Sequence, residues 1–232
     1  EFLFDILKAL NFGPRWIGWI RSIFHSSRIS ILVNGSPTKE FIPSRGLRQG
    51  APLSPLFFIL VGEVLSCMLD LGVQKRIFRG VALKGGEQDI SHLQFADDVI
   101  LFVNDDDCSV LGVKRTLQCF QVLSGMKINF EKSHIYGFHA SISQINSWVS
   151  FLGCRQGLFP FSYLGASIGS SPTSVKFWDP LIKRIRKKLS EYDTSHISMA
   201  GMIIILKSVI DSTPIYWLSL YKLPVTVLNS IE

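Results

Sequence analysis

Two adjacent carboxylates, Asp97 and Asp98, are the side chains of this sequence that are best placed to do chemistry. They separate a partly alternating segment, residues 90–95, from a wholly apolar one, residues 99–103. The pattern predicts two short strands joined by a tight acidic turn. Two ionised carboxylates between buried strands are costly unless they face water or hold a cation, and carboxylate oxygens suit Mg²⁺. A plain acidic turn is the alternative, because Asp is a favourable turn residue.

A basic loop with two glycines precedes this hairpin, at residues 44–55. It offers hydrogen-bond donors and positions for close backbone approach, namely Arg45, Gly46, Arg48, Gln49 and Gly50. Ser54 as N-cap and Pro55 at the first helical position predict a helix, which residues 56–71 continue. Because this helix is apolar on nearly every side, we expect it to be buried. Such a loop can lay backbone and Arg groups along a phosphate chain or a base pair.

The loop and the acidic turn together resemble a known family. Residues 45–55 read Arg-Gly-Leu-Arg-Gln-Gly-Ala-Pro-Leu-Ser-Pro, and residues 95–98 read Phe-Ala-Asp-Asp. In this order they resemble the reverse transcriptase domain of non-LTR (LINE-like) retrotransposons, in the form common in plants. The resemblance extends along nearly the whole chain, through residues 127–133, the primer-grip-like residues 163–169 and the thumb-like residues 178–224.

The resemblance and the pattern of elements imply an α+β fold. We expect a palm-like antiparallel sheet backed by helices over residues 1–170, followed by a helical thumb-like region over residues 171–232. The implied reaction is RNA-directed DNA synthesis, in which a primer 3′-hydroxyl attacks an incoming deoxynucleoside triphosphate on an RNA template. Two Mg²⁺ ions stabilise the attacking and leaving oxygens in such a reaction.

The resemblance also implies roles for particular residues. Asp97 is the stronger candidate metal ligand, with Asp98 beside it. Lys132 is the candidate general acid for the leaving pyrophosphate, Lys127 is the alternative, and a plain surface lysine fits equally well. The loop residues 45, 46 and 48–50 would contact the template and the nucleotide. The primer end would rest on Tyr163, Leu164 and Gly165.

A second acidic group, residues 105–107, needs no metal to explain it. The three aspartates run into an expected helix, and acids at a helix N-terminus offset its dipole. Residues 127–130 then predict a short strand.

The segment 181–189 predicts an amphipathic helix with a basic outer face. Four apolar residues fall within one arc, and the others are Lys183, Arg184, Arg186, Lys187 and Lys188. Lysine and arginine side chains that meet phosphates give binding that is independent of sequence and sensitive to salt. From the helix alone, a merely solvated face is an equal alternative. The formal net charge of +6 and the polymerase-like motifs favour nucleic acid.

The composition suits one or two globular domains with a true core, since 47% of the 232 residues are hydrophobic and 18% are charged. The four cysteines have no metal-type spacing, which predicts an intracellular protein, nuclear or cytoplasmic, and not a secreted one. Interruptions at Gly62, Glu63 and Lys207 predict apolar runs too short for a membrane span, and so no membrane partner.

Three departures from the family pattern bear on activity. The family carries another metal-binding Asp on a strand that precedes the segment resembling residues 1–7, so we expect a chain cut at its N-terminus and inactive alone. Asp5 cannot replace that residue, because it falls on the outer face of the first helix. Ala51 stands where Asp is usual, and Met202 stands where Arg is usual.

Three functions therefore stay open. The first is a reverse transcriptase fragment, the second is a catalytically dead remnant that still binds nucleic acid, and the third is a structural domain with no nucleic-acid role.

Overall fold

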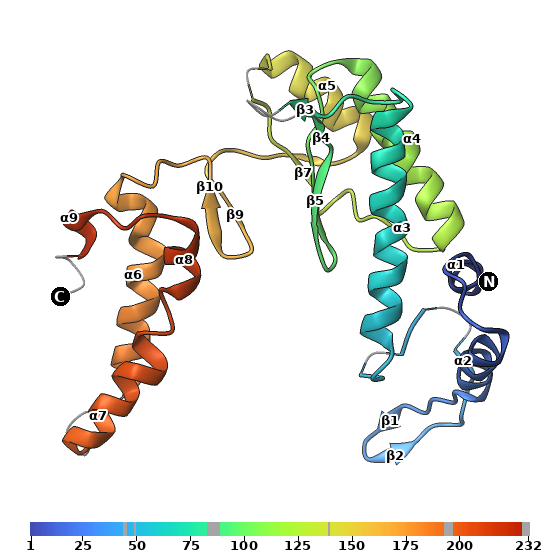
Figure 1. Ribbon diagram of the computed structural model, residues 1–232, viewed down its shortest axis with the longest axis horizontal. Helices are drawn as coiled ribbons and strands as arrows, with labels where there is room; N and C mark the ends of the chain where they lie inside the picture. Colours follow the sequence, from blue (N-terminus) through green and yellow to red (C-terminus); the bar gives the residue numbers. More distant parts are fainter. Residues whose placement is uncertain (44–45, 49, 83–88, 139, 193–196, 229–232) are drawn as a thin grey trace. The chain divides into compact units, whose positions relative to one another are not determined.

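The structure is a computed structural model that describes residues 1–43, 46–48, 50–82, 89–138, 140–192 and 197–228. The chain forms two compact units (Figure 1). Unit 1 comprises Glu1–Ser133 and His139–Arg155, and unit 2 comprises His134–Phe138 and Gln156–Glu232. The expected boundary between palm and thumb, near residue 170, stays a prediction.

Unit 1 combines helices with short antiparallel strand pairs. Its helices are α1 (Phe2–Ala9), α2 (Pro14–Ser26), α3 (Ser54–Gln74), α4 (Asp107–Ser124) and α5 (Ile142–Leu152). Its strands pair as β1 (Leu32–Val33) with β2 (Ser36–Pro37), β3 (Val81–Ala82) with β4 (Asp89–Ile90), and β5 (His92–Phe95) with β6 (Asp98–Leu101). Each pair is antiparallel.

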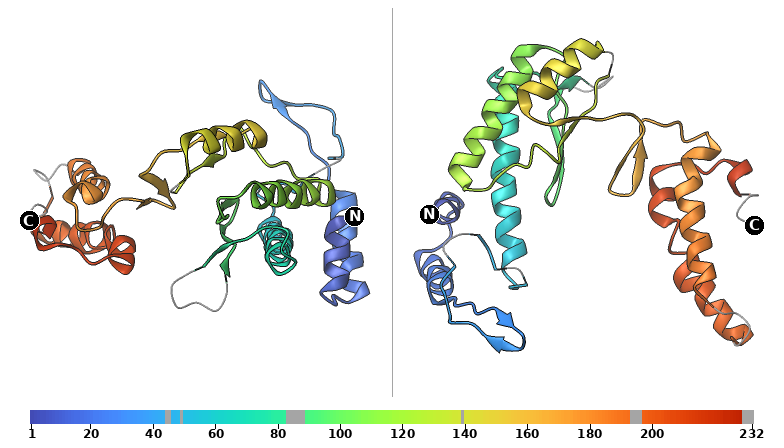
Figure 2. Two further views of the ribbon diagram at one scale, coloured as in Figure 1. Left: turned by 90° about the horizontal axis from the view of Figure 1, so that it is seen from above. Right: turned by 180° about the vertical axis from the view of Figure 1, so that it is seen from behind.

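The core of unit 1 lies between α3 and α4, which run side by side (Figure 1, Figure 2). Its buried side chains are Leu65, Leu69, Phe78, Val113, Leu117 and Phe120. Burying each of these side chains stabilises the folded state by roughly 1.5–3 kcal/mol. Gly112 allows the chain after α3 to cross α4 closely, because a Cβ there would overlap the carbonyl of Ile77.

Helix α4 begins where the sequence predicts. Asp106 is the N-cap, and its carboxylate accepts a hydrogen bond from the Ser109 backbone N–H at 2.8 Å. Gly125 ends the helix with a φ of 71°, the left-handed conformation that glycine adopts most easily. The acidic residues 105–107 thus include a capping residue, which accords with the explanation that needs no metal.

Helix α3 differs from its expected form. Its N-cap is Leu53 rather than Ser54, so the expected cap is wrong by one residue. The Ser54 hydroxyl instead donates a hydrogen bond to the Arg48 carbonyl at 2.7 Å. The expectation of a fully buried helix is also wrong, because unit 1 covers only part of its circumference. At least half of the side-chain surface is exposed at Leu56, Ile59 and Leu71.

The same helix corrects an expectation about membranes. Gly62 and Glu63 do not interrupt it, and α3 is long and apolar enough to cross a membrane by length and composition. A core helix passes the same test, and Phe57, Leu65 and Leu69 of α3 are buried within unit 1. The absence of a membrane partner stays a prediction.

Unit 2 contains two strand pairs and a group of helices. The strands are β7 (His134–Ile135), which pairs with β8 (Arg155–Gln156), where the chain passes from unit 1 to unit 2, and β9 (Phe161–Tyr163), which pairs with β10 (Ala166–Ile168). The helices are α6 (Val175–Ser190), α7 (Met199–Ile205), the π-helix η2 (Leu206–Ile210), α8 (Ile215–Leu220) and α9 (Val225–Leu228).

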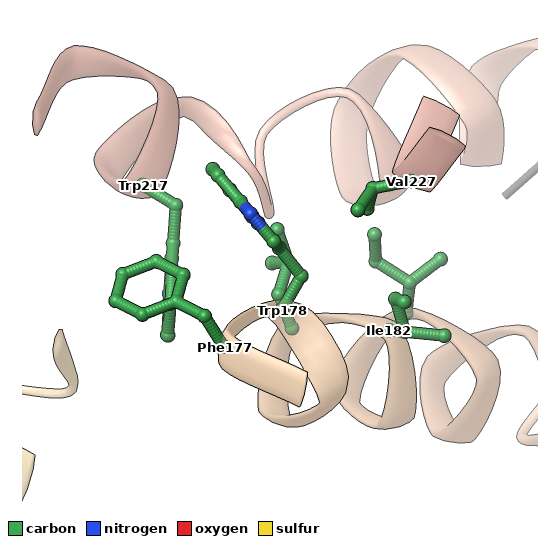
Figure 3. Close-up of a cluster of buried hydrophobic side chains, with 7 residues drawn as sticks. Phe177, Trp178, Ile182, Trp217 and Val227 are labelled. Atoms are coloured by element: carbon green, nitrogen blue, oxygen red, sulfur yellow. The ribbon is translucent and has the colours of Figure 1, made fainter. Parts of the chain in front are cut away.

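An aromatic core holds the helices of unit 2 together (Figure 3). Phe177 and Trp178 of α6 pack against Trp217 of α8, with ring centroids 5.3 Å and 5.8 Å apart respectively. Trp178 is fully buried, and its indole Nε1 donates a hydrogen bond to the Pro172 carbonyl at 2.8 Å. Val227 of α9 closes the cluster. The buried indole therefore leaves no polar atom unsatisfied.

The fold class is α+β, as predicted, with small antiparallel sheets. In the described residues the strands form separate pairs rather than one continuous sheet. The strand predicted at residues 127–130 is wrong, because no described strand pairs with it. Ile128 and Phe130 instead pack on the core of unit 1, which accounts for their alternating apolar pattern.

Candidate active site and nucleic-acid interface

The two candidate metal ligands lie at the tip of the β5–β6 hairpin. Phe95 pairs with Asp98, so Ala96 and Asp97 form a two-residue turn. Ala96 has a φ of 52°, a left-handed conformation that costs a non-glycine residue roughly 1–2 kcal/mol. Both Asp97 and Asp98 are exposed. The sequence thus predicted the hairpin and its acidic turn correctly.

The two faces of this hairpin differ in an unexpected way. Residues directly opposite in an antiparallel pair share a face, so Gln94 lies with Val99, and Leu93 lies with Ile100. The Gln94 face is half-buried, while Leu93 and Phe95 are 50% and 61% exposed. The polar side chains of β5 therefore face the unit, and its apolar side chains face outward together with the Asp98 carboxylate.

A group of polar side chains, which we call the polar seam, joins β5 to helix α3. It comprises Ser66 and Asp70 of α3 with Ser91, His92 and Gln94. The Ser66 Oγ lies 2.7 Å from His92 Nε2, and the Ser91 Oγ lies 2.7 Å from His92 Nδ1. Sequence reasoning missed this group, although the four-residue spacing of Gly62, Ser66 and Asp70 in an apolar helix signals it.

The ligand atoms at the tip of the hairpin are of the type that Mg²⁺ prefers, but few residues supply them. Asp97 and Asp98 supply exposed carboxylate oxygens, the ligands that Mg²⁺ prefers. Within the described part of the chain, no group of three or more His, Cys, Asp or Glu side chains is placed to hold a metal. The hairpin alone therefore offers a partial coordination sphere.

The basic loop is described at residues 46–48 and from residue 50 onward. Gly46 and Gly50 have φ values of 80° and 83°, which favour glycine. The Arg48 side chain is exposed, while its carbonyl accepts hydrogen bonds from Ser54 Oγ and from the Ala51 N–H. The loop is thereby fixed to the start of α3. The candidates Arg45 and Gln49 lie outside the described residues.

Lys132, the candidate general acid, lies in a turn after the core segment of unit 1. Its backbone N–H donates hydrogen bonds to the Asn129 carbonyl and side-chain oxygens, at 3.2 Å and 3.1 Å. Its side chain is exposed and makes no ion pair with Asp97 or Asp98 among the described residues. Lys127 is exposed as well. The choice between the two lysines stays a prediction.

The primer-grip candidates form the turn of the β9–β10 hairpin in unit 2. Tyr163 pairs with Ala166, and Leu164 and Gly165 have φ values of 50° and 84°. The hairpin is anchored by stacking of Phe161 on Tyr136, with ring centroids 3.9 Å apart. The three primer-grip candidates thus lie together at one hairpin turn of unit 2.

The basic residues of α6 are arranged as the helical pattern requires. Leu181, Ile182 and Ile185 are buried against the aromatic core. The exposed basic side chains of the predicted segment 181–189, which we call the basic face, are Lys183, Arg184, Arg186 and Lys187. Lys188 lies at the edge of the core and donates a hydrogen bond to Thr213 Oγ1 at 3.0 Å. Lys188 is therefore held by the protein, whereas the basic face is open to a ligand.

Comparison with known protein families gives the class of this chain. Residues 1–168 match the family described as reverse transcriptase (RNA-dependent DNA polymerase), and the chain belongs to that family. The matched region contains the basic loop, the polar seam and the Asp97–Asp98 hairpin.

Several curated relatives come from mobile elements. The chain is 32% identical over 136 residues to the Transposon TX1 uncharacterized 149 kDa protein of Xenopus laevis, a match that covers 57% of this chain and 10% of that protein. It is 36% identical over 128 residues to the Retrovirus-related Pol polyprotein from type-1 retrotransposable element R2 of Popillia japonica, covering 55% of this chain and 17% of that protein. An uncharacterized mitochondrial protein of Arabidopsis thaliana is 45% identical over 67 residues, or 29% of this chain and 55% of that protein.

These matches confirm the resemblance to reverse transcriptases of non-LTR retrotransposons. The plant-type form of the element stays a prediction. The matched region spans about a tenth of the TX1 protein and about a sixth of the R2 polyprotein.

Proposed function

We propose that this chain is part of an RNA-directed DNA polymerase that extends a DNA primer on an RNA template. One observation carries the proposal: in a chain of the reverse transcriptase family, two exposed carboxylates stand at the tip of a defined hairpin. The β5–β6 hairpin would belong to a palm-like sheet, and residues 171–232 would form the thumb-like region. The substrates would be deoxynucleoside triphosphates.

The acidic tip would hold Mg²⁺ through Asp97, the more direct ligand, and Asp98. When bound, two such ions stabilise the attacking and leaving oxygens of a phosphoryl transfer. The protein must then supply further oxygen ligands, because the described residues include no group of three or more His, Cys, Asp or Glu side chains that could hold a metal ion. Lys132 would protonate the leaving pyrophosphate, for which it must reach the departing oxygen.

The remaining candidates would bind the nucleic acid. Gly46 and Gly50 let the loop backbone approach the template and the nascent base pair, and Arg48 is exposed beside them. Arg45 and Gln49 would act with them. In unit 2, the turn of Tyr163, Leu164 and Gly165 would support the primer end. The basic face would meet backbone phosphates in a sequence-independent way.

The proposal is tested by primer extension on an RNA template with purified protein and deoxynucleotides. We expect extension that requires Mg²⁺ and stops when ribonucleotides alone are supplied. The assay should include the chain by itself and the chain extended upstream by its own genomic sequence. Activity that ignores the template strand would contradict the proposal.

A second function is binding of nucleic acid without catalysis. It is favoured by the small number of candidate metal ligands at the hairpin. The described residues hold no third acid beside the hairpin, and Ala51 and Met202 differ from the usual family residues. If the extended protein binds an RNA–DNA hybrid but adds no nucleotide, this second function is the correct one. In either case we propose an intracellular protein, nuclear or cytoplasmic, because all four cysteines are free thiols.

A further inference from the structure

The polar seam stands out because helix α3 is otherwise almost wholly apolar. Gly62, Ser66 and Asp70 are spaced by four residues, so they follow one side of the helix. They meet Gln94, His92 and Ser91 in that order along the hairpin segment. A Cβ at Gly62 would lie 2.5 Å from Gln94 Nε2, so glycine is what lets this amide lie on the helix. Three matched contacts in a row indicate a fixed register between helix and hairpin.

The contacts of the polar seam can fix the position of the hairpin along α3, which apolar packing cannot do. Burial of apolar surface is non-directional, so Val99 and Leu101 can hold β6 against the core without fixing its position along α3. Hydrogen bonds are directional, so they break when the hairpin slides along α3 or tilts against it. A two-stranded hairpin is only marginally stable without packing, so its position depends on these contacts.

The hydrogen bonds of the polar seam place a proton on His92 Nδ1. The Ser91 hydroxyl donates to the Asp70 carboxylate at 2.9 Å, so its oxygen is left to accept from His92 Nδ1, 2.7 Å away. The Ser66 hydroxyl has one proton and lies within hydrogen-bond distance of both His92 Nε2, at 2.7 Å, and Gln94 Oε1, at 3.3 Å. The His92 side chain is only 11% exposed, which protects this arrangement from water.

We propose that the polar seam, with His92 at its centre, positions the acidic tip for nucleotide addition. His92 lies three residues before Phe95, so roughly 10 Å of strand separates His92 from the turn. Rocking the hairpin by about 5° about His92 moves the carboxylates by about 0.9 Å, more than the ~0.5 Å that a productive site tolerates. His92 is thus a positioning residue that acts through Asp97. This inference rests on the proposed function for its kinetic consequence.

The test compares Ser66→Ala with Cys67→Ala, which changes the adjacent, exposed residue of the same helix. His92→Gln is compared with His25→Gln, an exposed histidine of unit 1. In primer extension by the upstream-extended chain, we expect kcat to fall at least tenfold for Ser66→Ala and His92→Gln. The KM for the nucleotide should change less than twofold, and both controls should behave as wild type.

Two measurements on the chain itself decide the inference independently of activity. Nitrogen-15 NMR should show a proton on His92 Nδ1. Amide hydrogen exchange in β6 and the turn should be faster in Ser66→Ala than in Cys67→Ala, while exchange in α4 is unchanged. A His92 ring without a proton on Nδ1, or equal exchange in the two variants, would overturn the inference. If these signatures hold and even the wild type adds no nucleotide, the proposed function fails and the seam remains a device that positions the hairpin.

Discussion

Removing two charges from the basic face should change the salt dependence of nucleic-acid binding by a predictable amount. Lys183 and Lys187 of α6 are one helical turn apart and exposed, whereas Lys188 is engaged by Thr213. The double change Lys183→Gln and Lys187→Gln therefore removes two free charges without disturbing the core. If each lysine meets one phosphate, the slope of log K against log salt falls in magnitude by about 1.8.

This change in slope determines how much the binding constants of wild type and variant differ at each salt concentration. A fourfold rise in salt, from ~50 to ~200 mM, is about 0.6 log unit. The ratio of the wild-type binding constant to that of the variant therefore falls about 12-fold across this range. The assay is fluorescence anisotropy with a labelled RNA–DNA hybrid at several salt concentrations.

The matched control is Lys207→Gln with Lys222→Gln, which removes the same charge from exposed positions elsewhere in unit 2. The control should keep most of the wild-type slope. An unchanged slope in the α6 variant, or an equal loss in the control, would refute the reasoning and leave the basic face merely solvated.

Three further predictions concern stability, each measured by urea denaturation. Trp178→Ala should destabilise unit 2 by ~3–5 kcal/mol, because it empties the centre of the aromatic core; a loss below ~1 kcal/mol would contradict that packing. Gly112→Ala should cost ~1–3 kcal/mol, because the added methyl group meets the Ile77 carbonyl, and a neutral result would mean that the crossing is looser than described. Asp106→Ala should cost about 1 kcal/mol at neutral pH. Burial raises the pKa of Asp106, but hydrogen bonds from Ser109 and the charge of Arg79 lower this pKa overall. The Asp106 carboxylate therefore stabilises the fold fully above pH ~4, and this stabilisation is lost as the pH falls through the lowered pKa. A difference in unfolding free energy between wild type and Asp106→Ala that stays constant down to pH ~2 would contradict this.

The sequence predicted the helices and turns that depend on local chemistry. The acidic residues 105–107 lead into α4, whose N-cap is Asp106. The hairpin at residues 95–98 was likewise visible in its turn residues. In each case a few adjacent side chains determine the backbone.

The sequence did not predict what depends on contacts between distant segments. The strand expected at residues 127–130 has no partner in the described residues, so its alternating pattern serves packing instead. The exposure of Leu56 and Ile59 depends on how much of α3 the rest of unit 1 covers. The polar seam pairs α3 with a strand more than twenty residues later, and no local propensity reveals which hydroxyl meets His92.

The central claim is that the Asp97 carboxylate takes part directly in nucleotide addition. The most direct measurement is the single-turnover rate of the Asp97→Asn variant of the upstream-extended chain, with saturating primer–template and nucleotide. The control is Asp105→Asn, an exposed acid beyond the end of β6. We expect Asp97→Asn to abolish nucleotide addition while hybrid binding and folding stay intact, and Asp105→Asn to keep the wild-type rate. A rate near wild type for Asp97→Asn would show that the acidic turn is structural and that the catalytic carboxylates lie elsewhere.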